Sequence, residues 1–186
     1  MRMMLNNVRI AFCQDLFSPG TFAGDSSAKP TYSSTFLIPK DDKQVKAIEK
    51  AMVEAAKDRW SDKADKILDG LKKQDRVCLR DGDMKDQYDG FEGCFYIKAN
   101  NGIKPGVFDL NRDDISEESG KLYAGCYVNA SIEIYAQDNQ WGRRINAKLR
   151  GVQKVADGDA FAGGAPASAD EFEDIADTGN NDDLLD

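Results

Sequence analysis

The sequence contains no histidine among its 186 residues, and this absence excludes several classes of enzyme. Histidine is the usual general base near neutral pH and the commonest protein ligand of transition metals. Without it, the Ser-His and Cys-His pairs that activate nucleophiles cannot form. The phosphate-binding patterns GxxxxGK[ST] and GxGxxG are absent as well, so nothing indicates nucleotide hydrolysis. We therefore expect a protein that is not an enzyme and needs no cofactor.

Long apolar runs and paired cysteines are also missing. No run approaches the roughly 20 residues that span a bilayer, and the polar residues Asn6, Asn7 and Arg9 interrupt the start of the chain where a signal peptide would be apolar. The cysteines are scattered and none forms a CxxC pair: Cys13, Cys78, Cys94 and Cys126. These features predict a cytoplasmic protein with no membrane contact, whose thiols are free rather than joined in disulfides or bound to zinc.

The negative charge of the chain is concentrated at its C-terminal end. The net charge is -8 at pH 7, which by itself would argue against a nucleic-acid partner. Residues 157–186, however, hold ten of the 33 acidic residues and none of the 25 Lys and Arg, so residues 1–156 keep 23 acidic against 25 basic residues, a net charge of +2. The body is mildly basic. Residues 157–186 have few large apolar side chains and are predicted to be a disordered acidic tail.

Residues 1–156 are predicted to form one mainly β domain with a helical insertion at about residues 41–70. Val8, Ile10 and Phe12 alternate along a first strand over residues 5–13. Residues 18–30 are a loop, and residues 31–38 form a second strand that Pro39 ends. A helix begins near Asp41 or Asp42 and runs to about residue 60, followed by a shorter helix over residues 62–69 that Gly70 ends. The apolar stripe of the first helix should pack on the core; it consists of Val45, Ile48, Met52, Ala56 and Trp60.

The second half of the body alternates strands and turns. Short strands are predicted over residues 76–80, 93–99 and 107–110, and a polar loop over residues 113–120. The strongest β pattern is a long hairpin, with strands over residues 123–136 and 142–155 joined by residues 137–141. Its inward face should be apolar: Val128, Ala130, Ile132, Ile134, Ala136, Ile145, Ala147 and Leu149. Its outward face should be polar and includes Tyr127, Asn129, Ser131, Glu133, Tyr135, Arg144, Asn146, Lys148 and Arg150.

This outward face combines aromatic rings with cations, the combination that single-stranded DNA requires. Cations follow the phosphates, while rings stack on unpaired bases of any sequence, at about 1–3 kcal/mol per base. Polar strand faces often carry the same residue types as simple cross-strand pairs, which is the alternative interpretation. The candidate DNA-binding residues of the hairpin and the preceding segments are Tyr88, Phe91, Tyr96, Lys98, Lys104, Arg112, Tyr127, Tyr135, Trp141, Arg143, Arg144, Lys148 and Arg150.

The acidic tail fits the same hypothesis, although acidic tails also serve solubility alone. A polyanion attached to a basic groove can occupy it in place of phosphates until DNA displaces it. The tail ends in Asp182, Asp183, Leu184, Leu185 and Asp186, two apolar residues among acids, as a peptide that docks on partner proteins would.

Two other functions stay open from the residues alone. Carboxylates can hold Mg²⁺ for nuclease chemistry, and an acidic cluster is available in Asp81, Asp83, Asp86 and Asp89. Gly82, Lys85 and Gly90 among them favour a solvated surface loop instead. The excess of acidic residues also suits a DNA mimic or scaffold that binds other proteins.

Several ordered segments resemble a family of tailed-phage proteins, formerly a phage domain of unknown function and now associated with single-stranded DNA binding. The segments are Phe36-Leu37-Ile38-Pro39-Lys40, Tyr88-Asp89-Gly90, Tyr123 to Ala130, Tyr135 to Asn139, Arg144 to Ala147 and Gly151-Val152-Gln153. The tail resembles the acidic C-termini of phage and bacterial single-strand binders in general, except that many of those end in Phe and this one ends in Leu-Leu-Asp. The resemblance covers nearly the whole body.

The resemblance implies an OB-like, partly open five-stranded barrel, with the helices inserted beside it and the long hairpin as extended strands. It further implies a single-strand binder without sequence specificity that acts in phage DNA replication, recombination or repair, within the host cytoplasm. Phage replication or recombination proteins would be partners of the tail. A homodimer stays open.

Overall fold

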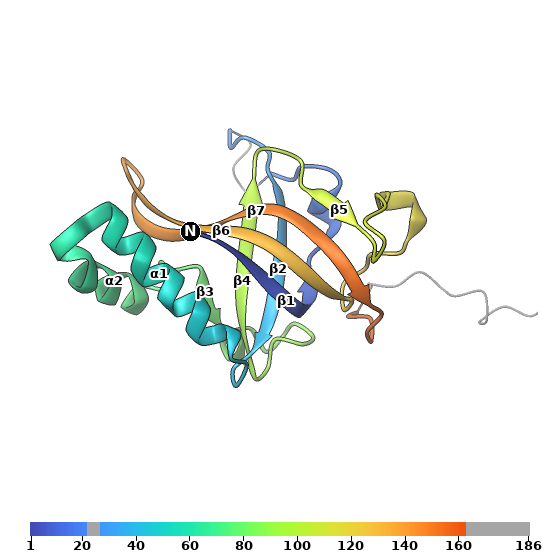
Figure 1. The fold of residues 1–186 in the computed structure, drawn as a ribbon, viewed down its shortest axis with the longest axis horizontal. Helices are drawn as coiled ribbons and strands as arrows, with labels where there is room; N and C mark the ends of the chain where they lie inside the picture. The colour runs from blue at the N-terminus through green and yellow to red at the C-terminus, as the bar shows by residue number, and fades with distance from the viewer. Residues whose placement is uncertain (22–26, 163–186) are drawn as a thin grey trace, which may run out of the picture.

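The computed structural model describes residues 1–21 and 27–162 as a ring of long strands with two helices at one end (Figure 1). The strands are β1 (Arg2–Ala11), β2 (Tyr32–Pro39), β3 (Leu79–Asp81), β4 (Cys94–Asn101), β5 (Gly106–Phe108), β6 (Tyr127–Asn139) and β7 (Gly142–Ala156). Helices α1 (Gln44–Trp60) and α2 (Ala64–Lys73) lie between β2 and β3. Short 3-10 turns are η1 (Gln14–Leu16), η2 (Ser61–Lys63), η3 (Gly82–Lys85) and η4 (Glu117–Ser119). The predicted mainly β fold with a helical insertion is confirmed.

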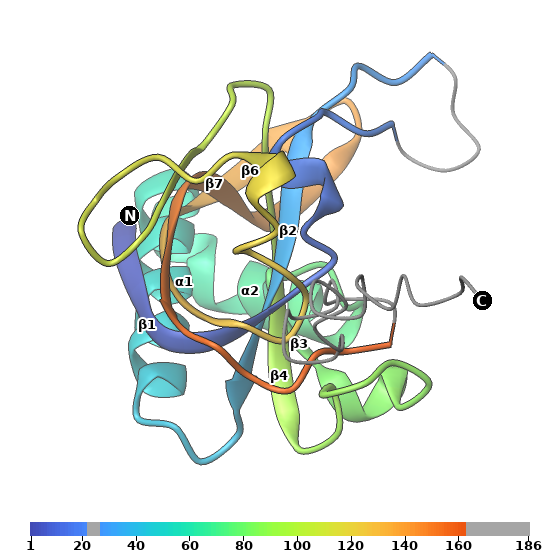
Figure 2. The ribbon, with the colours of Figure 1, turned by 90° about the vertical axis from the view of Figure 1, so that its right-hand side faces the viewer.

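Strands β1, β2, β4, β7 and β6 close into a barrel, which Figure 2 shows from its end. β1 pairs with β2 and β6, β2 with β4, and β6 with β7, all antiparallel. A short parallel pairing of β4 with β7 completes the ring, with Ala99 opposite Ala147 and Asn100 opposite Lys148. β3 and β5 pair with β4 and β7 outside this ring. The predicted OB-like barrel, partly closed at this seam, is confirmed.

Alternation along the strands fills the barrel interior with apolar side chains. On β6, Ile132 and Ile134 are fully buried, and on β7 Ile145 and Leu149 are at most 1% exposed. The inward face predicted for the hairpin therefore packs in the core, with Ala136 at its edge. The turn is shorter than predicted, because Asn139 pairs with Gly142 and leaves two residues between the strands.

The prediction for the end of the first strand is wrong. Val8 and Ile10 are buried as expected, but β1 ends at Ala11 and the next residue, Phe12, turns outward with a φ of 50° and 40% of its surface exposed. The alternation of apolar residues continues through Phe12 in the sequence, so the pattern alone does not show that the chain leaves the sheet there.

The prediction that Gly70 ends the second helix is also wrong, because α2 continues to Lys73. Leu68 and Leu71 are buried on either side of Gly70. Their burial, at about 1.5–3 kcal/mol each, outweighs the roughly 1 kcal/mol that a glycine costs within a helix. The stripe predicted for α1 is confirmed: Val45, Ile48, Met52, Ala56 and Trp60 are all buried.

The chain stays in contact with the barrel after β7, although the tail was predicted to start at residue 157. We call residues 157–162 the strap. Within it, the Phe161 amide donates to the Ala124 carbonyl and the Ala162 amide donates to the Asp89 carboxylate. The rest of the predicted tail, including its last residues Asp182 to Asp186, lies outside the described residues.

All four cysteines are free thiols, and the buried ones are poor nucleophiles. Burial raises the pKa of Cys78 to about 12 and that of Cys13 to about 11, so both stay protonated near neutral pH. No helix within residues 1–21 and 27–162 is both long and apolar enough to cross a membrane.

Candidate nucleic-acid interface

The outer surfaces of β2 and β4 carry a groove of about 450 Å³, which we call the β2–β4 groove. Ser33 and Thr35 line it from β2, and Tyr96 and Lys98 line it from β4. Thr35 lies opposite Lys98 in the sheet, and Arg80 of β3 extends the surface opposite Tyr96. In OB folds the second and third barrel strands form the face that binds oligonucleotides. β2 and β4 hold those two positions in this barrel.

An aromatic cluster from three separate segments forms one end of the groove. The rings of Phe12 and Tyr88 meet edge to face, with centroids 5.1 Å apart. Phe91 lies beneath them, 6.0 Å from Phe12 and 5.7 Å from Tyr88, and contacts Tyr96 at 5.4 Å. Phe91 is 1% and Tyr96 is 6% exposed, so both form the floor. Phe12 and Tyr88, at 40% and 41%, have ring surface left for a ligand.

The backbone of Phe12 is held in an unfavourable conformation. A φ of 50° is rare for a bulky residue and costs on the order of 1–3 kcal/mol. The conformation turns the Phe12 ring out of the barrel and against Tyr88. Such outliers cluster at binding sites, where a side chain must be presented to a ligand. Phe12 is therefore the strongest aromatic candidate in the groove.

The Phe12–Tyr88 ring pair also lines a second cavity, of about 330 Å³, which adjoins the groove. We call it the Phe161 cavity, because Phe161 of the strap forms part of its wall. Groove and cavity share Gln14 and Phe91 as well as the ring pair. The β2–β4 groove and the Phe161 cavity thus meet at the two exposed rings.

Cations line the groove beside these rings. The Lys85 ammonium lies 5.7 Å from the ring centroids of both Tyr88 and Tyr96. Lys98 is exposed, and within the described segments neither Lys85 nor Lys98 forms an ion pair. Arg80 is half-buried at the rim and forms an ion pair with Asp75 at 3.8 Å. The unpaired cations Lys85 and Lys98 beside aromatic rings suit a ligand that alternates phosphates with bases.

One carboxylate, Asp15, also lines the groove. It accepts a hydrogen bond from the Ser33 hydroxyl at 3.3 Å. Three cations, Arg80, Lys85 and Lys98, outnumber it among the groove residues, so the local charge favours an anion.

The cations of the long hairpin lie outside the lining of the groove, and Arg143 and Arg150 among them form ion pairs. Lys148 sits next to Asn100 across the closing seam and contacts the Tyr135 ring at 5.7 Å. Arg150 pairs with Glu133 at 3.5 Å. Arg144 is half-buried opposite Gln137. Tyr127 is half-buried and lies 5.6 Å from the guanidinium of Arg9.

The tip of the hairpin is braced by helix α1. The Trp60 indole donates to the Asp138 carboxylate at 2.8 Å, and Arg143 contacts the same oxygen at 3.2 Å. These two donors lower the pKa of Asp138, the indole most, so it stays charged. Trp141 at the turn is 73% exposed. Helix α1 therefore fixes the loop between the fourth and fifth barrel strands, one of the two loops that bind oligonucleotides in OB folds.

The structure separates the remaining predicted residues from the groove. Lys104 lines a different cavity together with Glu117 and Glu118. Arg112 lies at a φ of 70° beside Met4 and Phe108, on the outer side of β6 and β7. Neither residue lines the β2–β4 groove or the Phe161 cavity.

Three of the four carboxylates considered as a metal site form other contacts. The Lys40 ammonium contacts Asp81 at 2.7 Å and Asp83 at 2.5 Å, and these hydrogen bonds hold the pKa of both carboxyls below the usual range. Asp83 also accepts from the Gly93 amide, and Asp89 accepts from the strap. Within residues 1–21 and 27–162 no three such side chains converge on one point. The nuclease alternative has no site in this part of the chain.

Comparisons with known proteins identify the family of this chain. A family model described as "Enterobacter phage Enc34, ssDNA-binding protein" matches residues 1–185. Protein p50 of Acyrthosiphon pisum secondary endosymbiont phage 1 is 41% identical over 179 residues, which is 95% of each chain.

Solved structures are similar as well. The single-stranded DNA-binding protein from bacteriophage Enc34, in complex with ssDNA, is 26% identical with a TM-score of 0.70, over 86% of this chain and 88% of that chain. The single-stranded DNA-binding protein gp2.5 encoded by bacteriophage T7 has the same fold, with 12% identity and a TM-score of 0.56 over 92% and 97%.

The exposed ring of Phe12 gives a direct test of the groove. We expect Phe12→Ala to weaken binding of an oligo-dT strand by about 1–3 kcal/mol, the value of one stacked base. Fluorescence anisotropy at fixed salt measures this. Phe108→Ala is the matched control, because Phe108 is 36% exposed but lies on β5. Equal affinities of the two variants would contradict the assignment.

Proposed function

We propose that this chain, which belongs to the family of the Enterobacter phage Enc34 single-stranded DNA-binding protein, itself binds single-stranded DNA. The family resemblance predicted from the sequence is confirmed, and the family is one of DNA-binding proteins rather than enzymes. On this proposal the chain coats unpaired DNA, holds it extended and performs no reaction on it.

The observation that carries the proposal is the exposed Phe12–Tyr88 ring pair at the end of a groove lined by Arg80, Lys85 and Lys98. A ring offers its face to any base, so stacking gives affinity without sequence preference. The cations neutralise phosphates along the strand, a term that depends strongly on salt. Lys148 lies across the seam from the third barrel strand and extends the cationic surface onto the hairpin.

The second part of the proposal concerns the acidic tail, which competes with DNA and recruits partner proteins. Residues 163–186 contain eight acidic residues and no basic ones. The strap leads into them from the wall of the Phe161 cavity, so the tail starts beside the groove. A polyanion attached there competes with DNA phosphates for the same cations. Once DNA displaces it, the tail is free to recruit phage replication, recombination or repair proteins in the host cytoplasm.

A scaffold or DNA-mimicking role is the second candidate, favoured only by the acidic excess of the tail. One experiment distinguishes the two functions. A single-strand binder retards oligo-dT in a gel at low salt, and a DNA mimic leaves it free.

Charge reversal in the groove tests where the strand binds. We expect Lys85→Glu with Lys98→Glu to weaken oligo-dT binding and to reduce the slope of log K against log salt by about 1.4, since each phosphate contact contributes about 0.7. Anisotropy titrations at several salt concentrations measure both effects. The control is Lys46→Glu with Lys66→Glu, which makes the same charge change at exposed positions of α1 and α2. Equal slopes in the two double variants would refute the groove as the phosphate-binding surface.

Truncation after Ala162 tests the tail while keeping the strap. We expect the shortened chain to bind oligo-dT more tightly at low salt, with a difference that shrinks as salt screens the tail. A full-length chain with the eight acidic residues of 163–186 changed to Asn or Gln should behave like the truncated one. If neither change alters affinity at low salt, the tail does not compete with DNA.

A further inference from the structure

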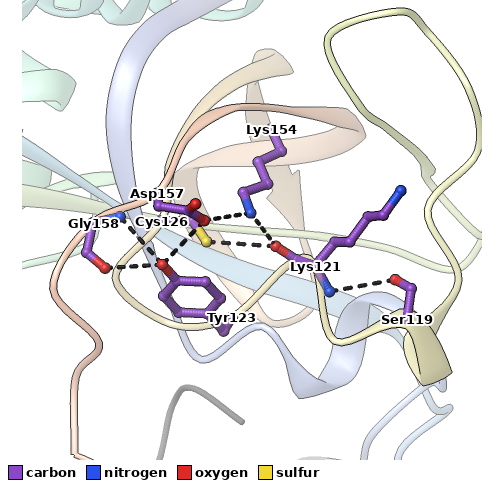
Figure 3. Close-up of polar contacts among 7 residues, drawn as sticks. All are labelled: Ser119, Lys121, Tyr123, Cys126, Lys154, Asp157 and Gly158. Atoms are coloured by element: carbon purple, nitrogen blue, oxygen red, sulfur yellow. Dashed lines mark hydrogen bonds and ion pairs between the residues drawn. The ribbon is translucent and has the colours of Figure 1, made fainter. Parts of the chain in front are cut away.

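The strap is held to the barrel by a polar anchor at its start (Figure 3). Lys154 of β7 contacts the Asp157 carboxylate at 2.6 Å, and the Tyr123 hydroxyl donates to the Gly158 carbonyl at 3.0 Å. Asp157 also accepts from the Tyr123 hydroxyl at 3.2 Å. Partial burial raises the pKa of Tyr123 to about 12, so this hydroxyl remains a donor at neutral pH. The contacts fix the direction in which the chain leaves β7.

Two glycines on the barrel surface leave space for the strap to pack closely against it. Gly125 has a φ of 111°, and a Cβ there would lie 2.2 Å from the Asp159 carbonyl oxygen. Gly90 has a φ of 82°, and a Cβ there would lie 2.4 Å from the Phe161 ring. Any larger residue at position 90 or 125 would collide with the strap and would also strain the backbone. The surface of the barrel is therefore shaped to receive residues 159–161.

The Phe161 ring is also held in a defined position by its contacts. Arg9 lies over it, with the guanidinium carbon 4.3 Å from the ring centroid, and donates to the Asp159 carbonyl. The Phe161 amide donates to the Ala124 carbonyl at 3.0 Å. The ring packs against the small apolar cluster outside the barrel that contains Leu37 and Phe91. A guanidinium on an aromatic ring contributes about 0.5–1 kcal/mol or more, so Phe161 is fixed rather than loosely attached.

The cavity that Phe161 lines remains open beside it. Its volume of about 330 Å³ is within the range of small-ligand sites. Aromatic rings form its walls, with Phe161 contributed by the strap and Phe12 and Tyr88 contributed by the rim it shares with the groove. Gln14, Gln87 and Asp89 add amide and carboxylate groups to the lining. Flat apolar walls with a few hydrogen-bonding groups suit an unpaired nucleobase, which has a π face and a polar edge.

We propose that the Phe161 cavity receives one nucleobase of the bound strand, with Phe161 as a stacking wall, so that the strap belongs to the DNA-binding site. This rests on the proposed function and adds a site to it. The strand lies in the β2–β4 groove and passes the Phe12–Tyr88 pair, and the next base enters the cavity. The side-chain amides of Gln14 and Gln87 then meet the edge of that base.

Substitution of Phe161 in the full-length chain tests the proposal. We expect Phe161→Leu, which keeps apolar packing but removes the ring, to weaken oligo-dT binding by about 5- to 150-fold, the loss of one stacked base. Phe108→Leu on β5 is the control for removal of a partly exposed phenylalanine and should bind normally. Urea unfolding of each variant shows whether the fold is intact.

Photocrosslinking gives a second readout that does not depend on affinity. An oligonucleotide with 5-iodouracil in place of thymine should crosslink to Phe161, Phe12 or Tyr88, as read by mass spectrometry of the peptides. The cavity assignment is wrong if Phe161→Leu binds oligo-dT as tightly as the unaltered chain, or more tightly, and no crosslink forms at Phe161. Tighter binding would mean that DNA bases displace the Phe161 ring from the barrel surface. If the unaltered chain fails to bind oligo-dT at all, the proposed function fails instead.

Discussion

The closing of the barrel between β4 and β7 is the constraint on which the rest of the structure depends. Once the ring is closed, one side of each strand faces an interior filled mainly by apolar groups, such as Ile132 and Ile134. The cationic side chains of those strands then lie outside. This places Lys98 of β4 and Lys148 of β7 on neighbouring outer surfaces, although fifty positions separate them in the sequence.

A second apolar layer outside the barrel supports the proposed binding surface. Ala11, Leu37, Phe91 and Tyr96 are buried together on the outer side of the sheet. Burying a side chain of the size of Phe91 contributes about 1.5–3 kcal/mol, enough to hold the segment between β3 and β4 against the strands. That segment brings Tyr88 and Lys85 to the groove, and the loop after β1 brings Phe12. The exposed rings are thus supported from below by buried ones, which keeps their orientation fixed.

Strand faces and candidate residue types depend on neighbouring residues along the chain and can be predicted from the sequence. Contacts between segments that folding brings together cannot. Alternation identified both faces of the long hairpin, and residue type identified Tyr88, Tyr96 and Lys98 as candidates. It could not show that Phe91 and Tyr96 are buried by an outer layer, or that Lys104 and Arg112 lie away from the groove. Arg80 and Lys85 were missed because β3 and η3 carry no periodic pattern. Phe161 was predicted to lie in the tail. In the sequence, its packing on the barrel is indicated only by Gly90 and Gly125, which leave space for the strap.

In the proposed complex, DNA lies across the outer surfaces of β2 and β4 beside Phe12 and Tyr88. Backbone amide chemical shifts during titration of the full-length chain with oligo-dT test this placement most directly. We expect the largest changes at Thr35, Lys98 and the residues after Ala11, with β5 and α2 unchanged. Changes centred on β5 and the loop around Arg112, with β2 and β4 unaffected, would contradict it.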